Sequence, residues 1–255
     1  MWTPPKTLIH DNRDELALGA VLLFYELARS CIESKGRFVT AISGGSTPRA
    51  MHRLMAEEPY RSYIPWKHIH LFWVDERCVP ERAPESNYGT ARRDLLDSVS
   101  IPSNQVHPIP VTVPHDEAAL HYEQELEHFF HRAGADKPNF DLMLLGIGTD
   151  GHTASLFPEQ DSLNERNRMV LPVRGGEPDI DRITLTLPAI NHARRIVFLV
   201  SGRKKASIMK YLSSGRPESK ALPAGLVRPV RGKILWMVDE DAASLMSGKA
   251  IQRGE

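Results

Sequence analysis

The side chains best suited to acid–base chemistry in this sequence are Asp150 and His152, which stand two positions apart at the end of a glycine-rich turn. The turn, Gly146 to Gly151, directly follows an apolar run from Leu142 to Leu145. An unbroken apolar run of this length is typical of a parallel strand covered on both faces, and ligands bind beyond the carboxyl ends of such strands. An imidazole placed there can serve as a general base near neutral pH. Asp150 can hold the tautomer of that imidazole, or it can shape the turn by accepting backbone N–H groups.

A second glycine-rich turn has the composition of an anion-binding loop. Its residues are Ser43, Gly44, Gly45, Ser46 and Thr47, between a predicted strand at 38–42 and a predicted helix at 49–57. Backbone N–H groups, hydroxyls and a helix N-terminus all favour a bound anion. The alternative is a tight turn with Ser or Thr as the helix N-cap. The turn lacks the Gly-Lys-Ser/Thr of a Walker A loop, and no Gly-x-Ser-x-Gly elbow occurs in the chain.

Further charged residues stand at the ends of predicted elements. The triplet Asp75-Glu76-Arg77 ends a predicted strand at 69–74, which we expect to neighbour the strand that precedes His152. Arg182 begins a predicted strand, and Lys205 begins a predicted helix. Each charge alone is typical of a solvated surface. The triplet, however, is expected at the same edge of the sheet as His152, where a ligand would bind.

Sequence signatures for a dinucleotide site and for a metal site are either incomplete or absent. The stretch Gly146 to Gly151 fits G-x-G-x-x-G, but Pro158 would end any helix within two turns, whereas a dinucleotide site needs a long helix there. No His-Glu-x-x-His occurs, and no cysteine or carboxylate stands at a metal-ligand offset from the other histidines. We therefore expect neither a bound dinucleotide nor a metal ion.

Composition narrows the class of protein. The 255 residues include 32 Lys and Arg and 32 Asp and Glu, so the formal net charge is zero, which argues against a general nucleic-acid or anionic-membrane surface. Two cysteines lie outside any C-x-x-C pair, residues 1–10 contain no apolar signal core, and no apolar stretch reaches membrane-spanning length. These features predict a cytoplasmic protein and leave the oligomeric state open.

Predicted strands alternate with predicted helices along the chain. The strands are expected at 38–42, 69–74, 142–145, 169–173, 182–187, 195–200 and 233–238, and the helices at 14–35, 49–57, 87–99, 116–132, 205–212 and 239–246. This alternation predicts an α/β fold in which a mostly parallel sheet carries helices on both faces. No composition shift marks a boundary, so residues 1–255 are predicted to form a single domain.

Taken together, these motifs resemble the glucosamine-6-phosphate isomerase/6-phosphogluconolactonase family, in the correct order and over nearly the whole chain. The matching blocks are Ser43-Gly44-Gly45-Ser46-Thr47-Pro48, Trp73-Val74-Asp75-Glu76-Arg77 followed by Ser86-Asn87, Leu145 to Pro158, Arg182 to Pro188, and Gly202-Arg203-Lys204-Lys205-Ala206. The glycine–aspartate–histidine block is specific for the family, and the five blocks together are much more so.

The resemblance implies a Rossmann-like three-layer α/β/α fold, a phosphorylated sugar substrate and no cofactor. It matches His152 to the family's catalytic histidine and Arg77 to a residue near the lactone end of the substrate. The turn 43–47, Arg182 and Lys205 become candidates to hold the 6-phosphate. The implied reaction is hydrolysis of the δ-lactone of 6-phosphogluconate by a water that His152 deprotonates. Arg77 and backbone N–H groups of the turn 146–151 are expected to stabilise the oxyanion.

Three more residues refine what the resemblance implies. Gly148, in the catalytic turn, and Asp75, at the neighbouring strand end, are expected to contact the substrate. The deaminases of the family continue the Asp-Gly-His block with Phe-Asn-Glu-Pro, whereas this chain has Phe157 at the glutamate position. Arg77 likewise stands where deaminases carry an aromatic residue. Both differences favour the lactonase branch, with a glucosamine-6-phosphate deaminase-like isomerase as the alternative.

Overall fold

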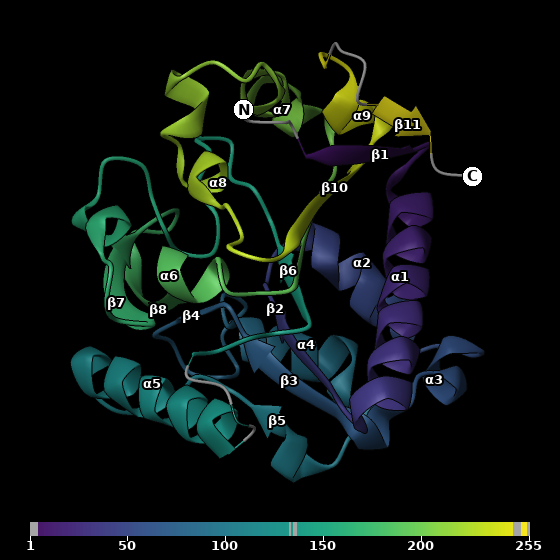
Figure 1. Cartoon of the computed structure of the whole chain (residues 1–255), viewed down its shortest axis with the longest axis vertical. Coiled ribbons are helices and arrows are strands. Elements are labelled where there is room, and N and C mark those ends of the chain that lie inside the picture. Colours follow the sequence, from purple (N-terminus) through teal and green to yellow (C-terminus); the bar gives the residue numbers. More distant parts are fainter. Residues whose placement is uncertain (1–4, 133, 135–136, 247–250, 254–255) are drawn as a thin grey trace.

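The strands of the main sheet are β1 (Lys6–His10), β2 (Phe38–Ile42), β3 (Ile69–Trp73), β5 (Val106–His107), β6 (Leu142–Leu145), β9 (Arg195–Val200), β10 (Lys233–Asp239) and β11 (Ile251–Arg253). The computed structural model describes residues 5–132, 134, 137–246 and 251–253. The sheet has the order β11-β1-β10-β9-β6-β2-β3-β5, and every neighbouring pair is parallel (Figure 1). The prediction of a mostly parallel central sheet is therefore confirmed.

The middle strands of this sheet are apolar because both of their faces are covered. Every residue of β2 and of β6 is buried, and so are five of the six residues of β9. A strand covered on both faces needs an unbroken apolar run, so its ends coincide with the first polar or glycine residues. The predicted bounds of these three strands agree with the structure for this reason.

Helices cover both sides of the sheet. They are α1 (Arg13–Lys35), α2 (Ser46–Met55), α3 (Tyr60–Tyr63), α4 (Asn87–Asp94), α5 (His115–Arg132), α6 (Leu187–Ile190), α7 (Ala206–Ser213), α8 (Pro223–Leu226) and α9 (Glu240–Ala243). In Figure 1, α1 and α2 lie on one side of the main sheet, and α5 and α6 lie on the other. The Asn12 side chain caps α1 by accepting from two backbone N–H groups, and Gly36 ends the helix with a φ of +79°.

A second, antiparallel sheet was not predicted. It consists of β4 (Asp75–Arg77), β8 (Ile180–Leu185) and β7 (Val170–Gly175), in the order β4-β8-β7. The alternation of elements had placed the last two strands in the main sheet, but a hairpin between β7 and β8 pairs them with each other instead. The register of β4 against β8 pairs Arg77 with Arg182, so two cations far apart in sequence become neighbours.

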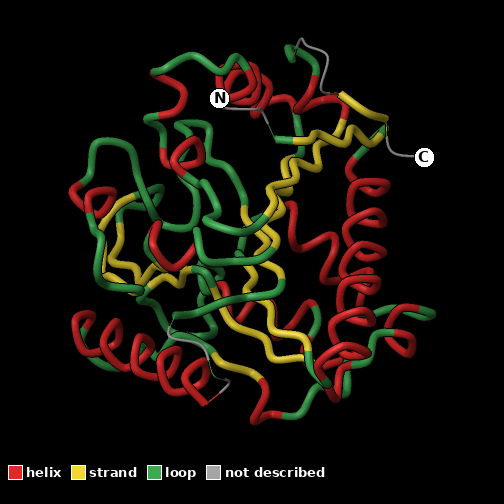
Figure 2. Tube along the Cα trace, in the orientation of Figure 1, coloured by secondary structure: helices red, strands yellow, loops and turns green. Residues whose placement is uncertain are grey.

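Several other expectations need correction. The strand β3 does not neighbour β6, because β2 lies between them. The short strands β1, β5 and β11 were not predicted, and the tube in Figure 2 shows them among the strands of the sheet. The helix predicted at 87–99 ends as an α-helix at Asp94, and the one predicted at 239–246 is the short α9. The helix predicted at 49–57 begins earlier, at Ser46.

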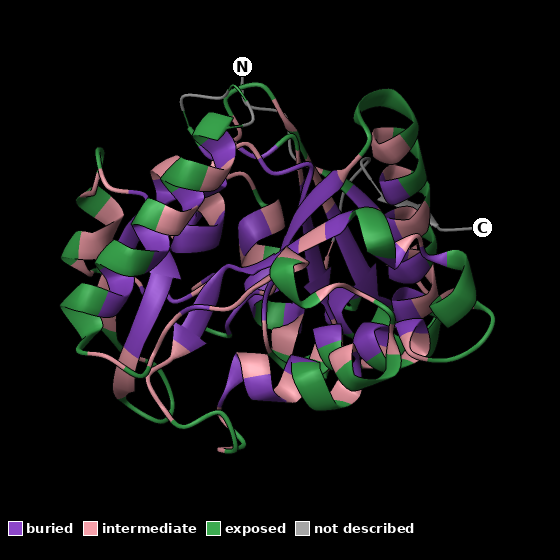
Figure 3. Cartoon of the chain, turned by 90° about the horizontal axis from the view of Figure 1, so that it is seen from below, coloured by how far each residue is buried: buried purple, intermediate pink, exposed green. Residues whose placement is uncertain are grey.

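One cluster of buried apolar side chains extends through both sheets. It joins residues of the main sheet, such as Leu144 and Phe198, to residues of the second sheet, such as Val170 and Ile183. Figure 3 shows the strands buried and the helices exposed on their outer faces. Among the described residues, no helix is both long enough and apolar enough to cross a bilayer.

Candidate active site

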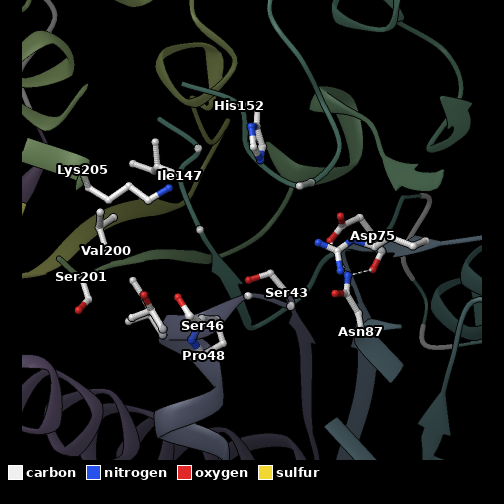
Figure 4. A pocket seen from close by; sticks show the side chains of 18 of the residues that line it. Ser43, Ser46, Pro48, Asp75, Asn87, Ile147, His152, Val200, Ser201 and Lys205 are labelled. Carbon is white, nitrogen blue, oxygen red and sulfur yellow. Dashed lines mark hydrogen bonds between the residues drawn. The ribbon is translucent and has the colours of Figure 1, made fainter. Parts of the chain in front are cut away.

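A pocket opens at the carboxyl ends of the central strands (Figure 4). Its walls are the turn after β2, the turn after β6, the end of β9 and the paired strands β4 and β8. The predicted site residues that line it are Ser43, Gly44, Gly45, Ser46, Thr47, Asp75, Arg77, Gly148, His152, Arg182 and Lys205. Asp150 does not line the pocket and contacts it through His152.

The imidazole of His152 is held by Asp150. Its Nδ1 lies 2.7 Å from Oδ1 of Asp150, and the same oxygen accepts the His152 backbone N–H at 3.1 Å. Because an ionised carboxylate only accepts hydrogen bonds, this contact favours the neutral tautomer that carries its proton on Nδ1 and leaves Nε2 as the basic nitrogen. Burial opposes ionisation of Asp150, but the backbone and ring of His152 outweigh burial and hold the pKa of the carboxyl below its usual value.

The turn 146–151 brings this pair into place through its own backbone bonds. The Gly148 N–H donates to the His152 carbonyl at 2.8 Å, and the Gly151 N–H donates to the Gly148 carbonyl at 3.0 Å. A Cβ on Gly148 would lie 2.1 Å from Nδ1 of His152, so only glycine fits under the ring. The N–H groups of Gly148 and Gly151 are therefore occupied, and the prediction that they stabilise an oxyanion is wrong for these two. Gly148 supplies space beside the ring instead.

Phe157 packs against the ring of His152. Its ring centroid is 5.0 Å from that of His152, and the guanidinium carbon of Arg182 lies 5.5 Å from the same ring. Phe157 is 7% exposed. The position at which the deaminases carry glutamate is thus filled by an aromatic ring that contacts two predicted site residues.

Arg182 is almost fully buried, with 4% of its surface exposed. Its Nε donates to the Gly175 carbonyl at 2.7 Å and its Nη2 to the Pro178 carbonyl at 3.2 Å, so the β7–β8 turn clamps one edge of the guanidinium. A Cβ on Gly176 would lie 2.4 Å from Nη2. Burial, and next the neighbouring Arg77, lower the pKa of Arg182. The remaining N–H groups of Arg182 are free of these carbonyls.

Arg77 is fixed by the loop that follows β4. Its Nη1 donates to the Glu85 carbonyl, while its buried Nε has no partner. The loop is gathered around the buried carboxylate of Glu76, which accepts from the backbone N–H groups of Arg77, Asn87 and Tyr88, each at 2.7 Å. Burial raises the pKa of Glu76, although these N–H groups oppose the shift. Glu76 therefore builds the wall without facing the pocket.

Asp75 is the buried carboxylate of the pocket, at 5% exposure. The Ser155 hydroxyl donates to its Oδ2 at 2.7 Å, and Nδ2 of Asn87 donates to its backbone oxygen at 2.9 Å (Figure 4). Asn87 also leaves room only for glycine at position 44, because a Cβ on Gly44 would lie 1.8 Å from the Asn87 side-chain oxygen. Asn87 lines the pocket but was not predicted as a site residue, although it belongs to a family-like block.

The turn after β2 leaves polar groups open toward the pocket. Gly45 is the N-cap residue of α2, with a φ of +105°, and no side chain caps the helix. The alternative prediction of a Ser or Thr N-cap is therefore wrong. The first N–H groups of α2 and the Ser43 hydroxyl, which is buried without a partner, remain available to an anion.

Lys205 approaches the same pocket from the end of β9. In Figure 4 its side chain extends from the wall beside Val200 toward the pocket interior. Burial lowers the pKa of Lys205, and the nearby charge of Asp150 opposes that shift. Three cations, Arg77, Arg182 and Lys205, line this one pocket, and among the described residues none of them forms an ion pair with a carboxylate within 4.0 Å. Carboxylates lie nearby all the same: Asp75 lines the pocket, and Asp150 acts on the charge of Lys205. The described residues contain no group of three His, Cys, Asp or Glu side chains placed to hold a metal ion.

Comparison with known proteins places the chain in a family. The profile described as glucosamine-6-phosphate isomerases/6-phosphogluconolactonase matches residues 11–236. The chain belongs to this family.

Family members align along almost the full length of the chain. A 6-phosphogluconolactonase of Homo sapiens is 38% identical over 255 residues, covering 97% of this chain and 96% of the relative. One from Synechocystis sp. is 36% identical over 240 residues, covering 93% and 97%. The crystal structure of 6-phosphogluconolactonase from Thermotoga maritima superimposes with a TM-score of 0.77 at 31% identity, covering 92% of this chain and 100% of that one.

Proposed function

We propose that the chain hydrolyses 6-phospho-D-glucono-1,5-lactone to 6-phospho-D-gluconate. The observation that carries the proposal is the combination in one pocket of an imidazole whose Nδ1 lies against a carboxylate and three cations that form no ion pair among the described residues. Such a pocket suits a neutral reacting group joined to an anionic one. The 6-phosphogluconolactonases of the family, which match this chain over nearly all of its length, are named after a substrate of that kind.

In the proposed mechanism, Nε2 of His152 takes a proton from water while the water oxygen attacks the lactone carbonyl carbon. General-base help of this kind contributes about 10² to 10⁴ in rate. Arg77, whose Nε lacks a partner in the free pocket, stabilises the oxyanion that forms. The tetrahedral intermediate then collapses, the bond from the carbonyl carbon to the ring oxygen breaks, and the imidazolium returns its proton to that oxygen.

The rest of the pocket positions the substrate. Lys205, the free edge of Arg182 and the turn 43–47 hold the 6-phosphate, and Asp75 faces the sugar hydroxyls. Binding energy from the phosphate, far from the reacting carbon, orients that carbon under His152. Asp150 acts by holding the ring in one tautomer. No covalent nucleophile or cofactor enters these steps.

We further propose a cytoplasmic location and no nucleic-acid partner. The support is the zero net charge and the presence of two free cysteines, Cys31 and Cys78.

The deciding experiment is a coupled assay with freshly generated 6-phosphogluconolactone, measured against its spontaneous decay. The proposal predicts product formation far above the spontaneous rate and no ammonia from glucosamine 6-phosphate, because Phe157 occupies the position of the deaminase glutamate. Ammonia release without lactone hydrolysis would assign the chain to the deaminase branch. Tight binding of 6-phosphogluconate without turnover would identify a metabolite-binding protein instead.

A further inference from the structure

A buried carboxylate outside the pocket contacts the segment that presents Lys205. Asp239 ends β10 and is 4% exposed. It lies in a separate hollow that shares Ser46 and Ser201 with the pocket but does not include Lys205. No step of the proposed mechanism uses Asp239.

The hydrogen bonds of Asp239 point to the end of the neighbouring strand β9. The Ser201 hydroxyl donates to its Oδ2 at 2.5 Å, and the Gly202 N–H donates to both carboxylate oxygens at 3.0 Å. In Figure 4 the Ser201 hydroxyl turns away from Lys205, which is the direction that a partner outside the pocket requires. A third bond, from the Ala242 N–H at 2.8 Å, caps α9.

Gly202 in turn is hydrogen-bonded to the backbone of Lys205. The Gly202 carbonyl accepts the Lys205 N–H at 2.9 Å and closes the tight turn Arg203–Lys205. Gly202 has a φ of +94°, a conformation that glycine adopts without strain. Asp239, Gly202 and Lys205 thus form an unbroken series of hydrogen bonds from a buried carboxylate to the backbone of a pocket cation.

We infer that Asp239 is a positioning residue for the anion-binding wall, acting through the turn 201–205 to set the place of Lys205 over the pocket. The inference rests on the proposed function, in which Lys205 holds the 6-phosphate. A cap for α9 alone would need one oxygen and one N–H, whereas Asp239 also engages both Ser201 and Gly202. The surplus bonds are directed at the pocket-forming turn.

The test uses Asp239→Asn, which keeps the size of the side chain and one oxygen to cap α9, but replaces the acceptor of the Ser201 hydroxyl by an amide. Displacement of Lys205 should raise KM for the phosphorylated lactone about tenfold, since small misplacements of a binding group are costly. KM for unphosphorylated D-glucono-1,5-lactone should stay unchanged. Asp241→Asn is the matched control, because this exposed carboxylate lies in the same hollow and is expected to leave both KM values unchanged.

A double-mutant cycle with Lys205→Ala separates positioning from general stability. If Asp239 acts through Lys205, Asp239→Asn should have no further effect on KM once Lys205 is alanine. Equal effects in both backgrounds, or a rise in KM for both lactones, would overturn the inference, and so would a variant that lowers only the melting temperature.

A binding measurement keeps this test independent of turnover. Titration of the wild-type protein and of Asp239→Asn with inorganic phosphate should show weaker binding by the variant. If the wild-type protein does not hydrolyse the lactone but binds phosphate more tightly than Asp239→Asn does, the proposed function fails while the inference on Asp239 stands. If the wild-type protein hydrolyses the lactone and both proteins bind phosphate equally, the inference fails alone.

Discussion

Two groups of charged residues, at opposite ends of the main sheet, differ in whether they form ion pairs. At the amino end, before β6, Asp141 has a side chain 1% exposed, yet it is fully compensated. Lys35 lies 2.5 Å from its Oδ1, the Val39 N–H donates to its Oδ2 at 2.9 Å, and Arg194 lies 3.8 Å away. This cluster ties α1, β2 and the start of β9 together.

At the carboxyl end, Arg77, Arg182 and Lys205 line one pocket, and none of them forms an ion pair within 4.0 Å among the described residues. Even the polar atoms Arg77 Nε and Ser43 Oγ are buried without partners. Burying unpaired polar groups costs stability, so their arrangement favours a ligand that supplies the missing partners. The contrast teaches that ion-paired charge holds the sheet together, while cations without an ion pair mark the place for an anion.

The largest expected effect is the loss of kcat when the proposed general base, His152, is removed. His152→Ala should lower kcat by about 10² to 10⁴ with little change in KM, because the variant loses proton transfer but keeps the phosphate contacts. Steady-state kinetics in the coupled assay measure both constants. The matched control is His68→Ala, at an exposed histidine just before β3 and so at the opposite end of the sheet. Near-normal turnover by His152→Ala would remove the imidazole from the mechanism.

The next largest effect is expected on KM, when one of the three cations that form no ion pair is removed. Lys205→Ala should raise KM for the phosphorylated lactone by about 10- to 100-fold, the value of a hydrogen bond to a charged group. Thermal unfolding should show no loss of stability, because a partly buried cation without an ion pair is removed. Lys204→Ala, at the exposed neighbouring lysine, should leave KM unchanged. An equal rise in KM for an unphosphorylated lactone would reject the phosphate contact.

Removing the ion-paired carboxylate Asp141 should lower stability and leave the kinetics unchanged. Asp141→Ala leaves Lys35 without its carboxylate and the Val39 N–H without its acceptor, and should cost about 3 kcal/mol in the free energy of unfolding. Denaturant melts measure this loss. The kcat/KM of the folded fraction should match the wild type. A variant with normal stability and altered kinetics would break the distinction between the two ends.

The smallest expected effect is a loss of folding stability at acidic pH. Burial lowers the pKa of His52, on α2, to about 4, whereas the same ring in the unfolded chain has the ordinary value of about 6.5. The unfolded chain therefore binds more protons between these values, and stability present above pH 6.5 is lost as the pH falls toward 4. The loss from this residue is roughly 1 kcal/mol at pH 5.5. Denaturant melts of His52→Met should show a shallower decline with acid, and an unchanged slope would contradict the assignment.

The sequence predicted the core of the fold and most of the site because both depend on local patterns. The apolar runs that form β2, β6 and β9 are bounded by glycine or polar residues, and the pocket-lining turns 146–151 and 43–47 directly follow β6 and β2. The second sheet could not be predicted in this way. Its pairing of Arg77 with Arg182 depends on β4 leaving the main sheet and meeting a distant hairpin.

Two supporting residues, Asn87 and Asp239, were missed for a related reason, and the triplet that contains Glu76 was expected at the site without its supporting role. Glu76, Asn87 and Asp239 act by hydrogen bonds to segments that only the folded chain brings near. No spacing rule predicts these hydrogen bonds from the sequence. The edge strands β1, β5 and β11 escaped because they are short, and β5 lies within a proline-rich connector.

The most direct test of the account compares kcat/KM of the wild-type protein for 6-phospho-D-glucono-1,5-lactone and for D-glucono-1,5-lactone, which differ only in the phosphate. If the unpaired cations serve the anionic end of the substrate, the phosphorylated lactone should be preferred by about 10²-fold or more. Equal values for the two lactones would contradict the account.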